Sequence, residues 1–354
     1  MHTIPTAPAS LSPPAEAFDP PTEVWSRLDK LLHDRLRKCV ALLPRVLSKD
    51  DPDAIHDLRV WSRRSQQLIV ALFPQPRPRE AQAIMKALRC ARHSLGAWRD
   101  CDVLIALLER KARRIRRADE KQAWEMIRDL ARKKRRGRMR RARSKLANRK
   151  LLALVHRGQK LIERRVARNG ERHQDPLAAF VSSVSEAQAK WREGLACARA
   201  SLTTGDIHAF RIQTKRLRYR VELARDLGSN AAQEALDSLK AIQDELGRWH
   251  DSTELVMLAA DALADPEFLA QHPRTAAAVL RKIDRNSALQ IERVRRLLEF
   301  THEGLERSAI QGWIRAYCGR ESVRSGEGVG GAARGSEHDA RPTTAPEDAM
   351  ALRT

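Results

Sequence analysis

Two short segments combine a histidine with arginine and lysine at helical spacing. Residues 55–64 read Ile-His-Asp-Leu-Arg-Val-Trp-Ser-Arg-Arg, and residues 207–216 read Ile-His-Ala-Phe-Arg-Ile-Gln-Thr-Lys-Arg. On an α-helix, positions i, i+3, i+7 and i+10 lie within about 80° of one another, so each segment predicts a straight row of side chains. The two rows are His56, Arg59, Arg63, Gln66 and His208, Arg211, Lys215, Arg218. Cationic rows that begin near the positive end of a helix suit phosphate groups.

The segments belong to a longer repeat. His56 and His208 are 152 positions apart, and Gly96 and Gly247, each within a Leu-Gly-x-Trp-x-Asp segment, are 151 apart. Two anchors at nearly the same offset predict a duplicated unit of about 150 residues. A single basic helical row is most often a solvated helix face, but the matched pair favours a shared binding function.

The Leu-Gly-x-Trp-x-Asp segments resemble helix junctions. We expect each glycine to end a helix and each aspartate to cap the next one, with the tryptophan packed in the corner. The residues concerned are Gly96, Trp98, Asp100, Gly247, Trp249 and Asp251, with Arg99 and His250 as further anion contacts. Before the first junction, Lys86, Arg89 and Arg92 share one helix face, and Lys240 is the equivalent of Arg89.

The composition indicates an all-α protein. Ala, Leu, Arg, Glu and Lys dominate the middle of the chain, and alternating β-branched runs are absent from the sequence. We expect Asp51 with Pro52, and Asp206, to open the two motif helices. The predicted helices are 22–43, 53–73, 79–95, 100–118, 119–168 with a possible split, 176–200, 206–227, 231–246, 251–263, 274–300 and 303–318. They would form two pseudo-symmetric four-helix bundles, repeat one over 21–168 and repeat two over 175–318, between disordered tails at 1–20 and 319–354.

Charge restricts the class of partner. The chain has a formal net charge of +22, and both tails are acidic, so residues 21–320 carry about +26. Such an excess favours a polyanionic partner. No segment is apolar and long enough to span a bilayer or to act as a secretory signal. Five scattered cysteines fit reduced thiols, so we expect a cytoplasmic protein without membrane insertion.

The motifs resemble those of the CHAD domain family. The resemblance rests on the two basic segments, on Leu217-Arg218-Tyr219 with Glu222 after the second, and on Leu95-Gly96 followed by Arg99-Asp100-x-Asp102-Val103-Leu104. It covers residues 21–318 and implies two four-helix bundles around a basic central channel that binds inorganic polyphosphate, in some members at polyphosphate granules. The first segment departs from the family pattern, since Ser65-Gln66 stands where Leu217-Arg218 stands in the second.

The resemblance also implies a set of ligand contacts. These are His56, Arg59, Arg63, Arg64, Lys86, Arg89, His208, Arg211, Lys215, Arg216, Arg218 and Lys240. An alternating-glutamate signature, which marks the CYTH domain next to many relatives, does not occur here. Paired carboxylates, a metal-ligand set and a phosphate loop are also absent from the sequence, so we expect neither catalysis nor a cofactor.

A second basic feature supports an alternative function. Residues 110–150 contain 20 Lys or Arg in 41 positions. Such a segment could bind RNA or DNA non-specifically, or it could be a long solvated helix on the outside of the first bundle. Motifs for base recognition are absent from the sequence, so the leading prediction is a non-catalytic polyphosphate-binding adaptor and the alternative is a non-specific nucleic-acid-binding protein.

Overall fold

The computed structural model describes residues 21–73, 77–113, 115–147, 153–169, 176–229, 231–304 and 308–327. These residues form helices and no strand, which confirms the all-α prediction. The helices are α1 (Pro21–Ser48), α2 (Pro52–Leu72), α3 (Arg79–Ala112), α4 (Ala118–Ala147), α5 (Leu154–Asn169), α6 (Pro176–Ser201), α7 (Thr204–Asp226), α8 (Ala232–Leu263), α9 (Pro266–Gln271), α10 (Pro273–Glu303) and α11 (Ala309–Glu327). The predicted tail at 1–20 lies outside the described residues. The predicted C-terminal tail begins too early, because α11 continues to Glu327.

The two motif helices begin with side-chain caps. Asp51 accepts hydrogen bonds from the backbone N–H groups of Asp53 at 3.1 Å and Ala54 at 2.9 Å, as predicted. In α7 the cap is Thr203, whose Oγ1 accepts from the backbone N–H of Asp206 at 3.1 Å. The prediction that Asp206 caps α7 is therefore wrong: its carboxylate instead accepts from the Thr203 hydroxyl at 2.7 Å inside the first turn.

Helices α3 and α8 run without interruption through the predicted junctions. Gly96 and Gly247 are helical, and Asp100 and Asp251 lie inside helices and do not cap them. Among the described residues the one glycine with a positive φ is Gly228, at 106°, where α7 ends. A glycine inside a helix costs about 1 kcal/mol, and packing of long helices such as these readily outweighs that cost. Similarly, α1 was predicted to end at residue 43, but it continues through Pro44 to Ser48.

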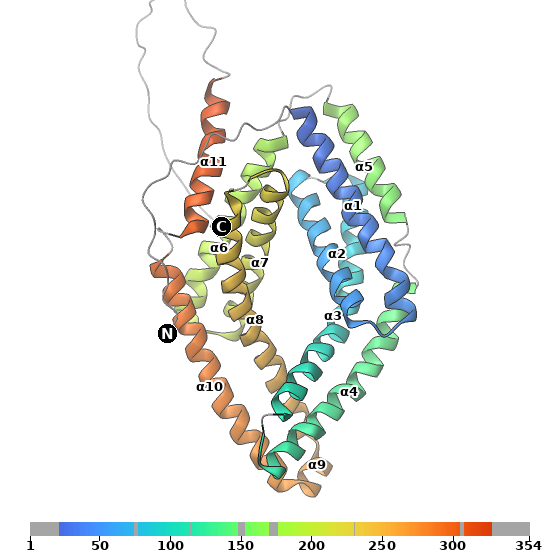
Figure 1. Cartoon of the computed structure of the whole chain (residues 1–354), viewed down its shortest axis with the longest axis vertical. Coiled ribbons are helices and arrows are strands. Elements are labelled where there is room, and N and C mark those ends of the chain that lie inside the picture. Colours follow the sequence, from blue (N-terminus) through green and yellow to red (C-terminus); the bar gives the residue numbers. More distant parts are fainter. Residues whose placement is uncertain are drawn as a thin grey trace, which may run out of the picture.

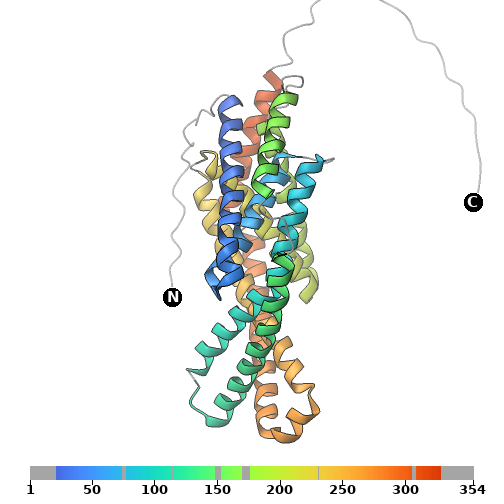
Figure 2. The same ribbon diagram turned by 90° about the vertical axis from the view of Figure 1, so that its right-hand side faces the viewer.

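The helices form two groups whose neighbour relations recur. In the first group α1 packs on α2, α2 on α3, α3 on α4, and α5 on α1 and α3. In the second group α6 packs on α7, α7 on α8, α8 on α10, and α11 on α6 and α8. Figure 1 shows the groups side by side, with α2 and α3 facing α7 and α8, and converging where α3 and α4 reach α8 and α10. Figure 2 shows that the assembly is narrow in the perpendicular direction.

Two apolar clusters lie at different levels of this assembly. The larger one contains residues of both groups and includes Trp98, Trp191 and Trp249. The smaller one joins α3 and α4 to α8 and α10 through Trp124, Leu255 and their neighbours. On α3 the larger cluster ends at Trp98 and the smaller begins at Leu104, so the polar residues between them lie between two cores.

Two buried arginines connect the groups. Arg35 of α1 is 5% exposed, and it donates hydrogen bonds to the backbone oxygen of Arg64 at 3.2 Å and to Asp226 of α7 at 2.7 Å. Arg220 of α7 donates to Ser183 Oγ at 2.6 Å and to the backbone oxygen of Gln67 at 3.0 Å. These contacts fix the distance between α2 and α7, the two motif helices.

We expect Arg35→Ala to destabilise the fold by about 3 kcal/mol, because removing one partner of a buried ion pair leaves the other partner uncompensated. The matched control is Arg225→Ala, which removes the exposed partner of the same carboxylate, 3.1 Å from Asp226. An exposed pair contributes about 0–1 kcal/mol. Urea unfolding of both variants measures the difference, and equal midpoints would contradict the assignment of Arg35 as the connecting residue.

Candidate anion-binding site

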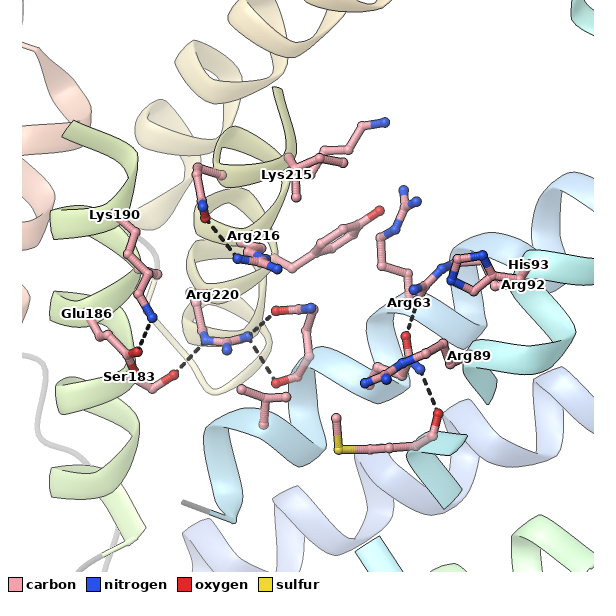
Figure 3. Close-up of a pocket in the computed structure, with 18 residues that line it drawn as sticks. Arg63, Arg89, Arg92, His93, Ser183, Glu186, Lys190, Lys215, Arg216 and Arg220 are labelled. Atoms are coloured by element: carbon pink, nitrogen blue, oxygen red, sulfur yellow. Dashed lines mark hydrogen bonds and ion pairs between the residues drawn. The ribbon is translucent and has the colours of Figure 1, made fainter. Parts of the chain in front are cut away.

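A cavity of about 530 Å³ lies between α2, α3, α6 and α7. Seven of the side chains that line it are basic, and all four helices contribute to them. They are Arg63, Arg89, Arg92, Lys190, Lys215, Arg216 and Arg220. Glu186 is the one carboxylate among the described residues of the lining, and it is paired with Lys190. Figure 3 shows the cations of α2 and α3 on one side and those of α6 and α7 on the other. The cavity is therefore strongly cationic and has no internal counterion of equal charge.

The cavity contains four of the sequence-predicted contacts, namely Arg63, Arg89, Lys215 and Arg216. Arg92 was predicted on the same helix face as Arg89 but not as a ligand contact. Sequence reasoning missed Lys190 and Arg220 altogether. Arg220 follows Arg216 by one helical turn, so its position in the second motif could have indicated it. Lys190 had no such signal, because it lies on α6 outside both motifs.

Gln66 has a defined role in this cavity. Its side chain is 5% exposed, its amide nitrogen donates to the backbone oxygen of Met85 at 2.9 Å, and its amide oxygen accepts a hydrogen bond from Arg92. Counted by the repeat offsets, Gln66 is equivalent to Arg218, and Arg92 is equivalent to Gln243. Each repeat therefore has one arginine and one glutamine at this pair of positions. In the first repeat the glutamine is on α2 and the arginine on α3, whereas in the second the arginine is on α7 and the glutamine on α8. The missing arginine of the first motif is supplied by α3.

Arg59 and Arg211 continue the cationic rows beyond the cavity. Arg59 Nη1 donates to the backbone oxygen of Arg92 at 2.9 Å, and the Nε of Arg211 is buried without a hydrogen-bond partner in the described part of the chain. A Cβ on Gly96 would lie 3.1 Å from Arg59 Nη1. Gly96 thus makes room for the guanidinium group, a role different from the helix end that was predicted. The rings of His208 and His250 lie 5.7 Å apart beside Arg211.

Burial and the repulsion between neighbouring cations lower the pKa values of several basic side chains in and beside the cavity. Burial, together with Arg211, Arg63 and Arg59, lowers the pKa of Lys215 to about 6. The same two causes lower the pKa of Arg92 to about 10 and that of His250 to about 3, with Arg211 as the principal charge acting on His250. The pKa of His208 is also lowered, first by burial and then by Arg211 and Lys215. A bound anion would reverse these shifts.

The remaining predicted contacts do not line the cavity. Arg64 lies on the α1 side of α2, where it pairs with Glu222 and covers the Trp61 ring at 4.7 Å. Arg218 stacks on Tyr219 at 4.7 Å. The others, which are exposed, are His56, Lys86, His208 and Lys240.

The arginine-rich segment is part of the fold. Helix α4 buries Trp124, Ile127 and Ala131, and it packs along α3. Arg135 pairs with Asp50 and Asp102, and Arg143 donates to the backbone oxygen of Lys49 at 2.7 Å. Lys133, Arg136 and Arg140 are exposed and lie on one face of α4. Much of the segment's charge therefore holds α4 in place.

Other kinds of site find no support within the described residues. No group of three or more His, Cys, Asp or Glu side chains could hold a metal ion. All five cysteines are free. None of the described helices is long and apolar enough to cross a membrane.

Comparison with known proteins assigns the family. The CHAD domain model matches residues 30–260, which is more than half of the chain. The chain belongs to the CHAD domain family. The crystal structure of the CHAD domain from the plant Ricinus communis has a similar fold, with a TM-score of 0.53 and 22% sequence identity over 83% of this chain and 91% of that one. A search of curated proteins gave no match.

The two motif glycines offer a matched test of the Arg59 position. A Cβ on Gly247 would meet nothing within 4 Å, whereas one on Gly96 would meet the Arg59 guanidinium. We expect Gly247→Ala to stabilise the CHAD domain by about 0.5–1 kcal/mol through helix propensity. Gly96→Ala should increase the free energy of unfolding by less, because Arg59 must give up its hydrogen bond to the backbone oxygen of Arg92. The loss of that hydrogen bond costs about 1 kcal/mol. Urea unfolding compares them, and equal gains would contradict the proposed role of Gly96.

Proposed function

We propose that this CHAD domain binds inorganic polyphosphate in the cavity between α2, α3, α6 and α7. The observation that carries the proposal is the set of seven basic side chains around one cavity with a single, already paired carboxylate. A linear polyphosphate carries charge on every phosphorus, with no sugar or base between the charges. It can therefore contact cations on four helices at once, and each contact releases counterions.

The proposed function is binding without chemistry. The cations that line the cavity are guanidinium and ammonium groups that can hold phosphoryl oxygens. Within the described residues they are accompanied by neither a metal-ligand group nor a pair of cavity carboxylates suited to acid–base catalysis. We therefore propose a cytoplasmic adaptor that associates with polyphosphate granules, where a bound chain would link the domain to other basic proteins.

A specific observation supports non-specific nucleic-acid binding as the second candidate. Lys133, Arg136 and Arg140 form an exposed row on α4 and have no hydrogen-bond or ion-pair partner in the described part of the chain. Such a row would contact a phosphate backbone electrostatically, without reading bases. It is a flat helix face, whereas the cavity surrounds its ligand.

A pair of double variants distinguishes the two functions. Arg63→Ala with Lys215→Ala removes two cavity cations, neither of which has a hydrogen-bond partner among the described residues. We expect polyphosphate affinity to fall by about 10-fold or more, from charged contacts of about 1–3 kcal/mol each. Lys133→Ala with Arg136→Ala removes the same pair of residue types, one lysine and one arginine, from α4 and should change polyphosphate affinity by less than about 3-fold.

Competition gel shifts with long-chain polyphosphate and mixed-sequence RNA provide the measurement for both double variants. If the α4 variant loses affinity and the cavity variant keeps it, the second candidate replaces the first. Circular dichroism of both variants confirms that they are folded.

Binding should depend on pH through Lys215, which lines the cavity. Lys215 has a pKa of about 6 in the free protein, and an anion beside it would raise that pKa, so binding takes up protons. We therefore expect affinity to increase as pH falls from 8 to 6 and to level off below. Titration calorimetry in buffers of different ionisation enthalpy measures the uptake. Lys215→Arg keeps the charge and should flatten the profile, and an unchanged profile would exclude Lys215 as the linked group.

A further inference from the structure

Three carboxylates lie at the end of the cationic rows, beyond Arg59 and Arg211. Asp100 is on α3, and Asp251 and Glu254 are on α8. Asp100 and Asp251 occupy equivalent positions of the repeat, since their separation is the 151 residues that separate Gly96 from Gly247. Because α3 and α8 run through the predicted junctions, these aspartates cap no helix. Their place in the repeated motif therefore needs another explanation.

These carboxylates face the motif arginines without being bonded to them. A Cβ on Gly96, one helical turn before Asp100 on the same face of α3, would lie 3.1 Å from Arg59 Nη1, so Asp100 follows directly after the part of α3 that contacts this guanidinium. Asp100 is also the opposite charge that acts most strongly on Arg59, as Asp251 is on Arg211. None of the three accepts a hydrogen bond or forms an ion pair in the part of the chain that the structure describes. Asp102, two residues from Asp100, differs because it forms an ion pair with Arg135. Asp102 therefore supports the fold, whereas Asp100 and Asp251 have no comparable structural partner.

The balance of charge differs sharply along the rows. In the cavity seven basic side chains face one carboxylate. The four arginines that act on Asp100 are Arg59, Arg138, Arg211 and Arg99, and they share their surroundings with the three carboxylates. Positive charge around Arg59 and Arg211 is therefore better balanced by carboxylates than it is in the cavity. The region around these two arginines also lies at the level between the two apolar clusters, where Trp98 and Trp249 end one cluster and Leu104 and Leu255 begin the other.

We propose that Asp100 and Asp251 are specificity-determining residues that end the anionic path at Arg59 and Arg211 and confine the bound chain to the cavity. This inference rests on the proposed polyphosphate function. Confinement favours a ligand that concentrates many charges in a small volume. Polyphosphate does so, whereas a strand of RNA separates its phosphates with sugars and would need the longer path that the carboxylates close.

Asp100→Asn with Asp251→Asn tests this role, since asparagine keeps the size of the side chain and removes its charge. Arg59 and Arg211 should then become available to phosphate. We expect the slope of log affinity against log salt to steepen by about one to two, one contact for each arginine. The affinity for RNA should increase more than the affinity for long-chain polyphosphate. The dissociation constant for RNA divided by that for polyphosphate should therefore fall by about 10-fold.

The matched control is Asp34→Asn with Asp284→Asn, which makes the same change in net charge at exposed positions of α1 and α10. It should leave both the salt slope and the ratio unchanged. Glu254→Gln, singly, is a second variant that should steepen the slope by less than the double variant and serves if the double variant does not fold.

Salt slope and ligand preference separate the two proposals. A slope in the Asp100/Asp251 variant equal to that of the control would overturn the confinement, whatever ligand the protein prefers. A steeper slope with an unchanged ratio would overturn the role in specificity. If the wild-type domain binds RNA as tightly as polyphosphate, the proposed function fails. The slope still reports whether the carboxylates close the path.

Discussion

The central constraint on this structure is the mutual repulsion of cations that the fold holds close together. Burial lowers the pKa of Arg59, Arg92, Arg211 and Lys215, and the positive charge of Arg63 lowers all four further. At partly buried positions such repulsion is weakly screened by salt. The two apolar clusters, with the connecting contacts of Arg35 and Arg220, hold the groups together despite this repulsion. A polyanion bound as proposed would relieve the repulsion, so the feature that destabilises the empty site would favour binding.

The sequence predicted the cationic rows because helical periodicity is local. Arg63 and Lys215 lie where the spacing of i, i+3 and i+7 put them, and the all-α class follows from the composition. Lys190 could not be found in this way, since its place in the cavity depends on how α6 packs against α7. Arg64 follows Arg63 directly in the chain, yet a turn of 100° carries it to the α1 side and to Glu222. Motif membership alone did not distinguish these neighbours.

The prediction that helices end at the two Leu-Gly-x-Trp-x-Asp segments was wrong for a physical reason. Glycine followed by a capping residue is a good signal for a helix end, but it measures only local preference. Leu95, Trp98, Leu104 and Leu108 bury one face of α3 across the segment, and this packing continues the helix. The glycine at 96 is better explained by the guanidinium of Arg59, a contact between residues 37 positions apart that no local rule describes. The charge of α4 likewise predicted a solvated or nucleic-acid-binding segment, whereas many of its cations form tertiary contacts that stabilise the fold.

The continuity of α3 and α8 has a mechanical consequence. These helices contain 34 and 32 residues, so each is a rod of roughly 50 Å at a rise of about 1.5 Å per residue. Each of these two helices packs into the larger apolar cluster along one part of its length and into the smaller cluster along another. The charged region around Arg59 and Arg211 lies between the two parts. A rigid rod held at two points transmits rotation from one end to the other. The packing of the smaller cluster, which includes Trp124 and Leu255, therefore bears on the position of α3 where that helix lines the cavity.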